Sequence, residues 1–284
     1  MPNIRYSSKK YIKPSRIVLY SLLLAVALII LTVIIFSLLG YRYIKVQTDN
    51  GSIKFFGKVS GEVPISGKLY YSDGRSAQID GKEGKVTYSD GTVYVGVLVN
   101  LMKNGNGTLT YPSGDSYKGT FVNDVITGKG EYTYSNGDTY VGDFLNNMKH
   151  GNGTYTFFSD GSYYTGEFEN DAKNGTGSLV YADGSSYVGN YKNDVKNGYG
   201  IYTFSNGDIY SGNFINDVRT GQGKYEFKAS GDVYEGEFLN NMMHGWGKYT
   251  WAAGRFYEGV FENGVIVRVE PELPDVPDDN TQDS

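Results

Sequence analysis

Hydrophobic and polar positions follow two different patterns along the chain. Residues 17–39 (IVLYSLLLAVALIILTVIIFSLL) form a run of 23 residues without a charge, which as a helix measures about 34 Å and matches the hydrocarbon core of a bilayer. From residue 84 onward, ring-bearing residues and glycines alternate with polar residues, as in β-strands with one buried face. The pattern predicts one transmembrane helix over 17–39, followed by a β-rich region.

The alternation recurs with a period of 23 or 24 residues. Alignment on Tyr-x-Gly-x-Phe finds eight copies, which begin at Tyr94, Tyr117, Tyr140, Tyr164, Tyr187, Tyr210, Tyr234 and Tyr257. Their glycines are Gly96, Gly119, Gly142, Gly166, Gly189, Gly212, Gly236 and Gly259, and seven Gly-x-Gly pairs lie between copies. These tyrosines and glycines are expected to be structural, because a fixed period indicates one building block used many times.

Each unit is predicted to be a β-hairpin, with GNGTYTF (151–157) as one strand and DTYVGDF (138–144) as another, joined by Ser/Asn/Asp-Gly turns. Rings and glycines share one side of both strands, and the other side is mostly polar. A single hairpin cannot bury its aromatic side, so hairpins are expected to stack edge to edge. The predicted fold class is all-β: a single-layer solenoid of about eight stacked hairpins, preceded by one N-terminal transmembrane helix.

The remaining segments complete the expected domain organisation. It consists of a basic cytoplasmic tail (1–16), the transmembrane helix (17–39), a linker (40–50), degenerate capping hairpins (51–83), the repeat solenoid (84–269) and an acidic disordered tail (270–284). The caps retain fragments of the repeat in Phe55-Phe56-Gly57 and in GKLYYSDG (67–74), and VIVRV (265–269) is expected to be a last strand.

Charge is distributed unevenly. Residues 1–45 hold seven of the 26 basic residues and none of the 31 acidic ones. Five of the basic residues precede the helix, so the positive-inside rule places the N-terminus in the cytoplasm and the repeats outside the cytosol. A cleaved signal peptide is the alternative, although its apolar region usually spans only about 7–15 residues. The acidic remainder argues against nucleic acid and against tight binding to anionic headgroups.

Candidate chemistry is sparse, and we expect no enzyme activity, no cofactor and no metal. The chain has no cysteine and two histidines. His150 and His244 are expected to be turn residues between hairpins, four repeats and about 40 Å apart, too far to share a metal. The Gly-x-Gly pairs open strands rather than helices, which argues against a phosphate loop. Junctions such as NDVKNG hold fewer acids than a calcium loop.

The aromatic rows are the candidate binding groove. One row is contributed by first strands, and the Tyr-x-Gly tyrosines contribute the other. Such rings either pack on one another as core or remain partly uncovered for an extended peptide, a helix or a sugar chain. The first-strand row consists of Tyr111, Tyr134, Phe157, Tyr181, Phe204, Phe227 and Trp251.

These motifs resemble the MORN (membrane occupation and recognition nexus) repeat family, whose unit of about 23 residues follows YxGxF…GxGxxxYxxGxxY. The resemblance covers roughly residues 84–264 and includes His-Gly before the second glycine at His150-Gly151 and His244-Gly245. It implies an elongated stack of β-hairpins that binds or scaffolds a protein partner, and some members have been linked to phospholipids.

Three functions stay open at this point. The first is a non-catalytic binding or scaffolding module, anchored in the membrane by 17–39, with a protein partner. The second is a cell-wall or glycan-binding module, although such repeats are usually rich in Trp and only Trp246 and Trp251 are present. The third is a lipid-associated accessory subunit of a signalling enzyme. Self-association through the sheet ends is also open, and no nucleic-acid partner is expected.

Overall fold

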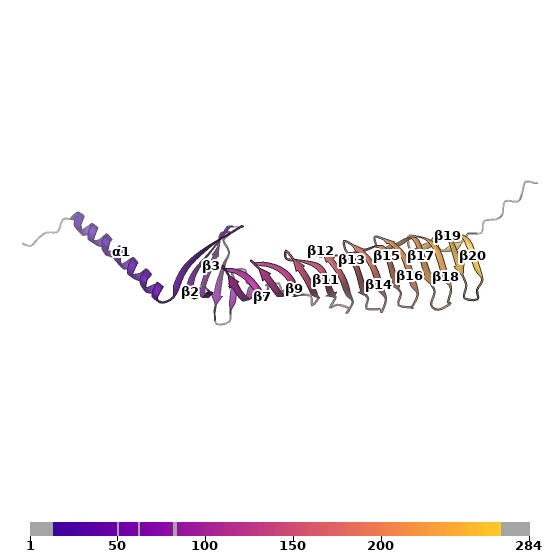
Figure 1. Cartoon of the computed structure of the whole chain (residues 1–284), viewed down its shortest axis with the longest axis horizontal. Helices are drawn as coiled ribbons and strands as arrows, with labels where there is room; N and C mark the ends of the chain where they lie inside the picture. The colour runs from indigo at the N-terminus through magenta and orange to yellow at the C-terminus, as the bar shows by residue number, and fades with distance from the viewer. Residues whose placement is uncertain (1–13, 50, 62, 82–83, 268–284) are drawn as a thin grey trace, which may run out of the picture. The chain divides into compact units, whose positions relative to one another are not determined.

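The computed structural model describes residues 14–49, 51–61, 63–81 and 84–267, which form one helix and 21 strands (Figure 1). All 21 strands belong to one open antiparallel sheet, which confirms the predicted fold class. The acidic tail 270–284 and most of the basic tail 1–16 lie outside the described residues. Contacts divide the chain into two units, residues 1–112 with 121–124 and residues 113–120 with 125–284.

The N-terminal unit begins with the apolar helix and continues as a meander of short strands. Its elements are α1 (Pro14–Leu38), β1 (Tyr41–Thr48), β2 (Gly51–Ser60), β3 (Val63–Tyr71), β4 (Ser76–Asp80), β5 (Lys85–Tyr88), β6 (Val93–Val99) and β7 (Met102–Thr110). Each strand pairs with the next in antiparallel register. The buried side chains of β2 and β3 are Ile53, Phe55, Pro64 and Leu69.

Helix α1 confirms the helix predicted over 17–39. In the described part of the chain it is the one helix, over Ser15–Leu38, that is long and apolar enough to cross a membrane. No residue of that stretch is buried against the rest of the chain. Its surface is therefore apolar and exposed along its length.

The predicted linker 40–50 is wrong for most of its length, because strand β1 occupies Tyr41–Thr48. Ile44 of β1 stands opposite Phe55 of β2, and Val46 stands opposite Ile53. These aliphatic residues extend the apolar side of the sheet, while the intervening tyrosines and lysine point the other way. The segment forms a strand because its apolar and polar residues alternate in step with those of β2, so both strands place their apolar residues on the same side of the sheet.

The C-terminal unit is the regular part of the sheet. Strand β8 (Ser116–Val122) carries residues of both units. It is followed by β9 (Val125–Thr133), β10 (Thr139–Leu145), β11 (Met148–Thr156), β12 (Tyr163–Glu169), β13 (Ala172–Val180), β14 (Ser186–Lys192), β15 (Val195–Thr203), β16 (Ile209–Ile215), β17 (Val218–Glu226), β18 (Val233–Leu239), β19 (Met242–Thr250), β20 (Phe256–Glu262) and β21 (Val265–Ile266). From β9 on, each strand pairs with the next. Of the last strand predicted at 265–269, Val265 and Ile266 form β21, Val267 lies past its end, and residues 268 and 269 lie outside the described residues.

Two kinds of turn alternate along this sheet. At one edge, two-residue turns such as Asn146-Asn147 have φ of 52° and 68°, the conformation of a type I′ hairpin turn. At the other edge lie the longer Ser/Asn/Asp-Gly turns, where Gly137 has a φ of 92°. The tight turns were missed in the sequence, and they start β11 and β19 early enough to include the two histidines. His150 and His244 therefore lie within strands, and their prediction as turn residues is wrong.

The Tyr-x-Gly motif is explained by a ring lying over paired glycines. Gly142 of β10 stands opposite Gly153 of β11, and the ring of Tyr140 covers both. A Cβ on Gly153 would lie 2.4 Å from Cε2 of Tyr140, closer than van der Waals contact allows. The Tyr140 hydroxyl donates a hydrogen bond to the Asp143 carbonyl at 2.9 Å, so the buried ring is also satisfied at its polar end.

Each core tyrosine is also covered by a ring of the next repeat. The ring of Tyr140 packs edge-on against Phe144 of its own strand, at 5.1 Å between centroids, and against Phe168 of the next repeat, at 5.0 Å. The same arrangement places Tyr187 against Tyr191 and Phe214. Because each ring needs the following repeat as a cover, stability depends on nearest-neighbour contacts.

Candidate functional site

The Tyr-x-Gly tyrosines cannot serve as a binding row. Their side chains are 0% exposed at Tyr94, Tyr117, Tyr140, Tyr164, Tyr187, Tyr210 and Tyr234. Only Tyr257, which no further repeat follows, is half-buried. Of the two alternatives for these rings, packing as core is the one observed, in keeping with their expected structural role, because each ring is enclosed by a glycine pair and by the next repeat. These tyrosines form the core.

The first-strand row is partly exposed along its whole length. All seven of its members, Tyr111, Tyr134, Phe157, Tyr181, Phe204, Phe227 and Trp251, are half-buried. Each follows directly after the end of a strand and begins a tip turn; the backbone N–H of Phe157, for example, donates to the Ser162 carbonyl at 2.9 Å. Their positions after the strand ends leave one side of each ring uncovered.

A second set of half-buried tyrosines fills the gaps between these rings, and the sequence analysis did not single it out. Tyr202 packs against Phe204 at 4.6 Å between centroids, Phe204 against Tyr225 at 5.6 Å, and Tyr225 against Phe227 at 4.5 Å. The rings from Tyr181 to Trp251 form one unbroken series of contacts, which we call the aromatic ladder: Tyr181, Tyr202, Phe204, Tyr225, Phe227, Tyr249 and Trp251. A shorter series joins Tyr132, Tyr134, Tyr155 and Phe157.

Carboxylates in the tip turns hold tyrosines of the shorter series and of the ladder. The Tyr155 hydroxyl donates to Oδ2 of Asp138 at 2.8 Å, while the other oxygen accepts the Phe158 backbone N–H at 2.8 Å. Asp232 binds the Tyr249 hydroxyl and the Ala252 N–H in the same way. The backbone hydrogen bond lowers the pKa of both carboxyls. These aspartates join successive tips and fix the orientation of the rings.

Basic side chains cover the ladder from the opposite edge of the sheet. Lys196 places Nζ 5.8 Å from the ring centre of Tyr181 and 5.4 Å from that of Tyr202. Arg219 lies in the same way over Phe204 and Tyr225, at 5.3 and 5.6 Å. Burial lowers the pKa of Arg219. Lys196 is also paired with Asp217, whose Oδ1 lies 3.6 Å from the lysine Nζ. Such a row therefore adds positive charge to the aromatic surface mainly through Arg219.

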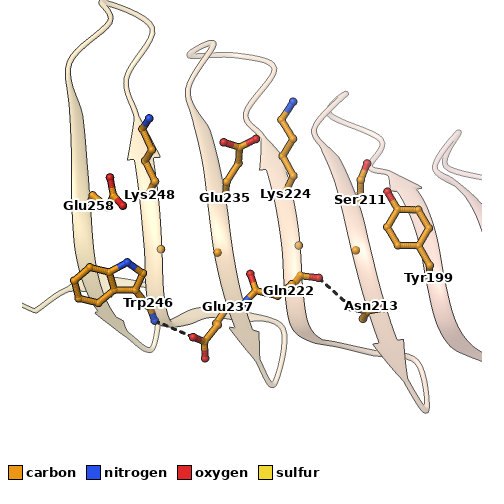
Figure 2. Close-up of a pocket in the computed structure, with 14 residues that line it drawn as sticks. Tyr199, Ser211, Asn213, Gln222, Lys224, Glu235, Glu237, Trp246, Lys248 and Glu258 are labelled. Atoms are coloured by element: carbon orange, nitrogen blue, oxygen red, sulfur yellow. Dashed lines mark hydrogen bonds between the residues drawn. The ribbon is translucent and has the colours of Figure 1, made fainter.

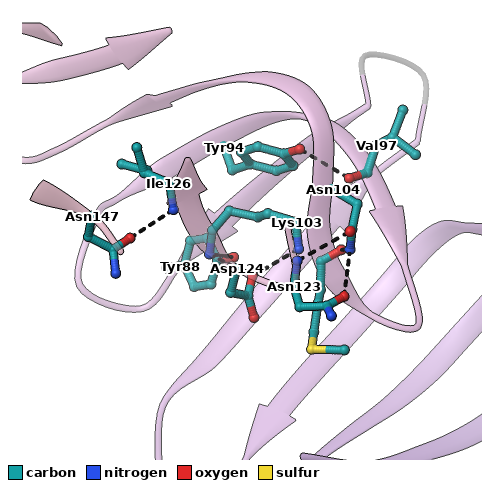
Figure 3. Close-up of polar contacts among 10 residues, drawn as sticks. Tyr88, Tyr94, Val97, Lys103, Asn104, Asn123, Asp124, Ile126 and Asn147 are labelled. Atoms are coloured by element: carbon teal, nitrogen blue, oxygen red, sulfur yellow. Dashed lines mark hydrogen bonds and ion pairs between the residues drawn. The ribbon is translucent and has the colours of Figure 1, made fainter. Parts of the chain in front are cut away.

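The basic row depends on the tight turns between hairpins. Asp124 accepts the backbone N–H of Lys103 at 2.8 Å, and its Oδ1 also lies 2.8 Å from the lysine Nζ (Figure 3). Ile126 occupies the equivalent position in the next repeat, where Asn147 accepts its N–H at 2.8 Å. A side chain five residues after the Phe position of the Tyr-x-Gly-x-Phe motif is thus aimed over the rings whether or not it is charged. Sequence reasoning missed this row, although Lys recurs after Asn-Asp-x.

The opposite face of the sheet carries an open trough of about 550 Å³ (Figure 2). Tyr199 and Trp246 flank it, with exposed fractions of 56% and 58%. Its polar lining includes Asn213, whose amide donates to the Gln222 carbonyl at 3.4 Å. Its floor is the backbone of Gly212, Gly223, Gly236 and Gly247, and Ser211, Lys224, Glu235, Glu237, Lys248 and Glu258 complete the lining. The sequence signal is a ring between two glycines, where other repeats have a polar residue.

Metal binding finds no support among the residues that the structure describes, since they contain no group of three or more His, Cys, Asp or Glu that could hold an ion. His150 and His244 belong to separate strands, β11 and β19. Nδ1 of His244 is buried without a hydrogen-bond partner in the described region. One isolated imidazole offers a single ligand, so it does not make a metal site.

The MORN repeat family matches the chain seven times, at residues 94–116, 117–139, 140–162, 164–186, 187–209, 210–231 and 234–254. These matches cover more than half of the 284 residues. The eighth copy, which begins at Tyr257, lies beyond them. No curated protein matches the sequence.

Solved structures with a similar arrangement are distant. The TCP10 domain of Danio rerio CPAP, in complex with a peptide of STIL, shares 11% identity over 78% of this chain and 100% of that one, with a TM-score of 0.39. The Drosophila melanogaster SAS-4 TCP domain, in complex with a proline-rich motif of Ana2, shares 18% over 55% and 85%, with a TM-score of 0.36. Staphylococcus aureus virginiamycin B lyase reaches a TM-score of 0.16 at 9% identity, over 78% and 85%. Likenesses this low carry no inference about function.

Proposed function

Because the chain belongs to the MORN repeat family, we propose that it is a single-pass membrane protein whose repeats bind and position a protein partner without catalysing a reaction. The observation that carries this proposal is the aromatic ladder with its cations. It offers a continuous strip of partly exposed rings and positive charge, which repeats from one hairpin pair to the next. Such a strip favours multivalent contact along an extended ligand.

The spacing of the ladder favours an extended peptide in the polyproline II conformation. Two strands per repeat, about 4.8 Å apart, give a repeat of about 9.6 Å. A polyproline II helix has three residues per turn and rises about 3.1 Å per residue, so it repeats every 9.3 Å or so. One prolyl ring per turn would meet each repeat's pair of aromatic rings, and acidic residues between the prolines would face Arg219. At Lys196 they would compete with Asp217. Aromatic-lined grooves bind proline-rich segments in this way.

The helix supplies the membrane attachment in this proposal. Helix α1 is long and apolar enough to cross a bilayer, and none of the residues Ser15–Leu38 is buried, which supports an uncleaved anchor. The five basic residues that precede it favour a cytoplasmic N-terminus and repeats outside the cytosol. Carbonate extraction of native membranes should leave the chain in the pellet, and protease added to intact cells should degrade the repeats. Recovery of a shorter, soluble chain would instead indicate a signal peptide.

The ladder is tested by peptide binding to the full chain in lipid nanodiscs. The probe is a synthetic peptide with proline at every third position and glutamate between, compared with a scrambled peptide. Phe204→Ala and Phe227→Ala should each weaken binding about tenfold, as expected for a ring at the centre of an interface. The matched control is Tyr163→Ala, because Tyr163 is 42% exposed and lies outside the ladder. Equal affinity for both peptides, or equal loss in all three variants, would refute the proposed ligand.

The trough between Tyr199 and Trp246 favours glycan binding as a second function. Exposed rings beside amides and carboxylates are the groups that stack on and hydrogen-bond to a sugar chain. A glycan array probed with the full chain in nanodiscs should then lose its signal on Trp246→Ala. Trp251→Ala is the control, because Trp251 belongs to the ladder and packs on Tyr249 at 5.0 Å. An array without saturable signal removes this alternative.

A further inference from the structure

The outward side of β1–β3, outside the matched repeats, presents nine side chains in a three-by-three arrangement. Lys45, Lys54 and Tyr70 stand in one row across the strands, Tyr43, Phe56 and Lys68 in the next, and Tyr41, Lys58 and Ser66 in the third. The opposite side of the same strands is the buried core around Phe55 and Leu69. We call the nine outward residues the basic grid.

The basic grid concentrates positive charge without a carboxylate. Its four lysines are all exposed, and Lys45 of β1 stands directly opposite Lys54 of β2. Like charges placed directly across a sheet destabilise it, so an arrangement of this kind favours an anionic partner that neutralises both. Among the described residues of β1–β4, the first acidic side chain on this side of the strands is Asp80 of β4, opposite Ser66.

The rings of the basic grid are unusually open to solvent. Tyr43 is 63% exposed, Phe56 49% and Tyr70 48%. In the repeats, by contrast, rings of the regular motif are buried or half-buried. Tyrosines beside lysines are the residues that accumulate at the headgroup level of a bilayer, where one end of the ring is in an apolar and the other in a wet environment.

The basic grid begins where the apolar helix ends. Phe36, in the last turn of α1, packs against Tyr41 at 5.2 Å and against Phe56 at 6.3 Å between ring centroids. Tyr41 and Phe56 in turn lie 6.0 Å apart. This cluster ties the grid to the end of the helix, so a bilayer crossed by α1 would bring its headgroups next to the grid.

We propose that the basic grid lies against anionic lipid headgroups of the membrane that α1 crosses. The lysines pair with headgroup phosphates, and Tyr43, Phe56 and Tyr70 enter the interfacial region. The inference rests on the proposed membrane anchor and applies to whichever leaflet carries anionic lipid. It revises the expectation, drawn from overall charge, that the acidic chain avoids anionic headgroups, because the positive residues are gathered on one side of three strands.

Protection of a sheet edge is a competing explanation for lysines on strands. It accounts for Lys45, because β1 is an outer strand. It does not account for Lys54, Lys58 and Lys68, which lie on strands paired on both sides. Edge protection also gives no reason for exposed rings between the lysines.

The absence of cysteine allows a single reporter to test the contact. Full chain carrying Ser66→Cys, with a fluorophore on that cysteine, is placed in nanodiscs of neutral lipid or of neutral lipid mixed with phosphatidylglycerol. Headgroup-labelled quencher lipid should reduce the fluorescence several-fold more strongly in the anionic discs, and added salt should reverse the difference. A label at Ser211→Cys, on the trough, should show no difference between the discs.

Charge variants decide what causes the quenching. Lys45→Gln, Lys54→Gln, Lys58→Gln and Lys68→Gln, combined in one chain, should abolish the difference between anionic and neutral discs. The matched control combines Lys118→Gln, Lys129→Gln, Lys192→Gln and Lys228→Gln, four exposed lysines of the repeats, and should keep it. Equal quenching in both discs, or an unchanged difference in the grid variant, would overturn the inference. A chain that fails to enter nanodiscs at all would instead refute the membrane anchor.

Discussion

Strands β2 and β3 use the same core device as the repeats but present a different surface. In β2 the ring of Phe55 lies over Gly57 and the opposite Gly67, as Tyr140 lies over Gly142 and Gly153. Phe55 has no hydroxyl, so the device depends on a ring over paired glycines and does not require the hydrogen bond. The outward side changes from the mostly polar one of the repeats to the rings and lysines of the basic grid. The comparison shows that the core constrains one side of each strand and leaves the residues of the other side free to differ between the two regions.

Removing the ring should have the largest effect in both regions. Phe55→Ala and Tyr187→Ala each delete a side chain that is 0% exposed, and loss of a buried ring costs about 3–5 kcal/mol in the free energy of unfolding. Amide hydrogen exchange should show local opening of β2–β3 in the first variant and of β14–β16 in the second.

Tyr257→Ala is the internal control for that experiment. Its ring is only half-buried, because no further repeat covers it, so it should cost clearly less than Tyr187→Ala. If Phe55→Ala were as mild as Tyr257→Ala, the equivalence of the two core devices would not hold.

Adding a methyl group to the paired glycines should have the next largest effect. A Cβ on Gly57 would lie 2.1 Å from the Ser66 carbonyl oxygen, and one on Gly153 would lie 2.4 Å from the Tyr140 ring. Overpacking of this kind costs about 1–3 kcal/mol, and Gly57→Ala and Gly153→Ala should lower the denaturation midpoint by similar amounts. The control is Gly161→Ala, where no atom lies within 4 Å and only the positive φ opposes the substitution. If Gly161→Ala lowered the midpoint more than the other two variants, the positive φ, and not the close contact with a neighbouring atom, would be the reason for glycine at these positions.

Raising the pH should lower the stability of the repeats gradually and by a smaller amount. This effect is specific to their core tyrosines, because the equivalent residue of β2, Phe55, cannot ionise. Burial raises the pKa of Tyr187, Tyr210 and Tyr234 from 10.0 to about 12. A raised folded-state pKa means that their contribution to stability is complete below pH 10 and is lost as pH rises from 10 toward 12. Ultraviolet absorbance should show these tyrosines ionising late, together with unfolding.

Tyr187→Phe copies the residue found at Phe55 and is the control for the alkaline experiment. It removes a 3.0 Å hydrogen bond to the Asn190 carbonyl, at a cost of about 1 kcal/mol at neutral pH. In return, stability should fall less steeply between pH 10 and 12 than in the unchanged chain. An unchanged pH slope would contradict the role assigned to this phenol.

The repeat period and the alternation within each unit were enough to predict the all-β sheet, the helix near the N-terminus and the structural role of the Tyr and Gly positions. They were not enough to predict the strand ends. The Asn-Asp and Asn-Asn turns adopt φ near 50° and 70° and allow pairing to begin immediately, which placed His150 in a strand. Strand β1 was missed for a related reason: its own residues show only a weak alternation. Its apolar side is recognised only when Ile44 and Val46 are paired with Phe55 and Ile53 of β2.

The candidate groove was likewise predicted only in part from the sequence. Tyr134 and Tyr140 look equivalent as rings on the aromatic side of a strand, yet one is half-buried and the other is 0% exposed. The difference comes from Phe168, which belongs to the following repeat and covers Tyr140. Likewise Lys196, a residue with no ring motif around it, reaches across to Tyr181 and Tyr202. Exposure of a ring depends on neighbours that a single unit does not contain.

The amino-acid sequence by itself determined the repeating unit and the side of each strand that packs, because both follow from local backbone geometry: side chains alternate along a strand, and glycine alone leaves room for a ring. The tertiary structure alone decided which rings and charges stay available to partners. Availability depends on how far adjacent hairpins cover one another and on which residues face each other across strands. The aromatic ladder and the basic grid therefore emerge only when the strands are placed side by side.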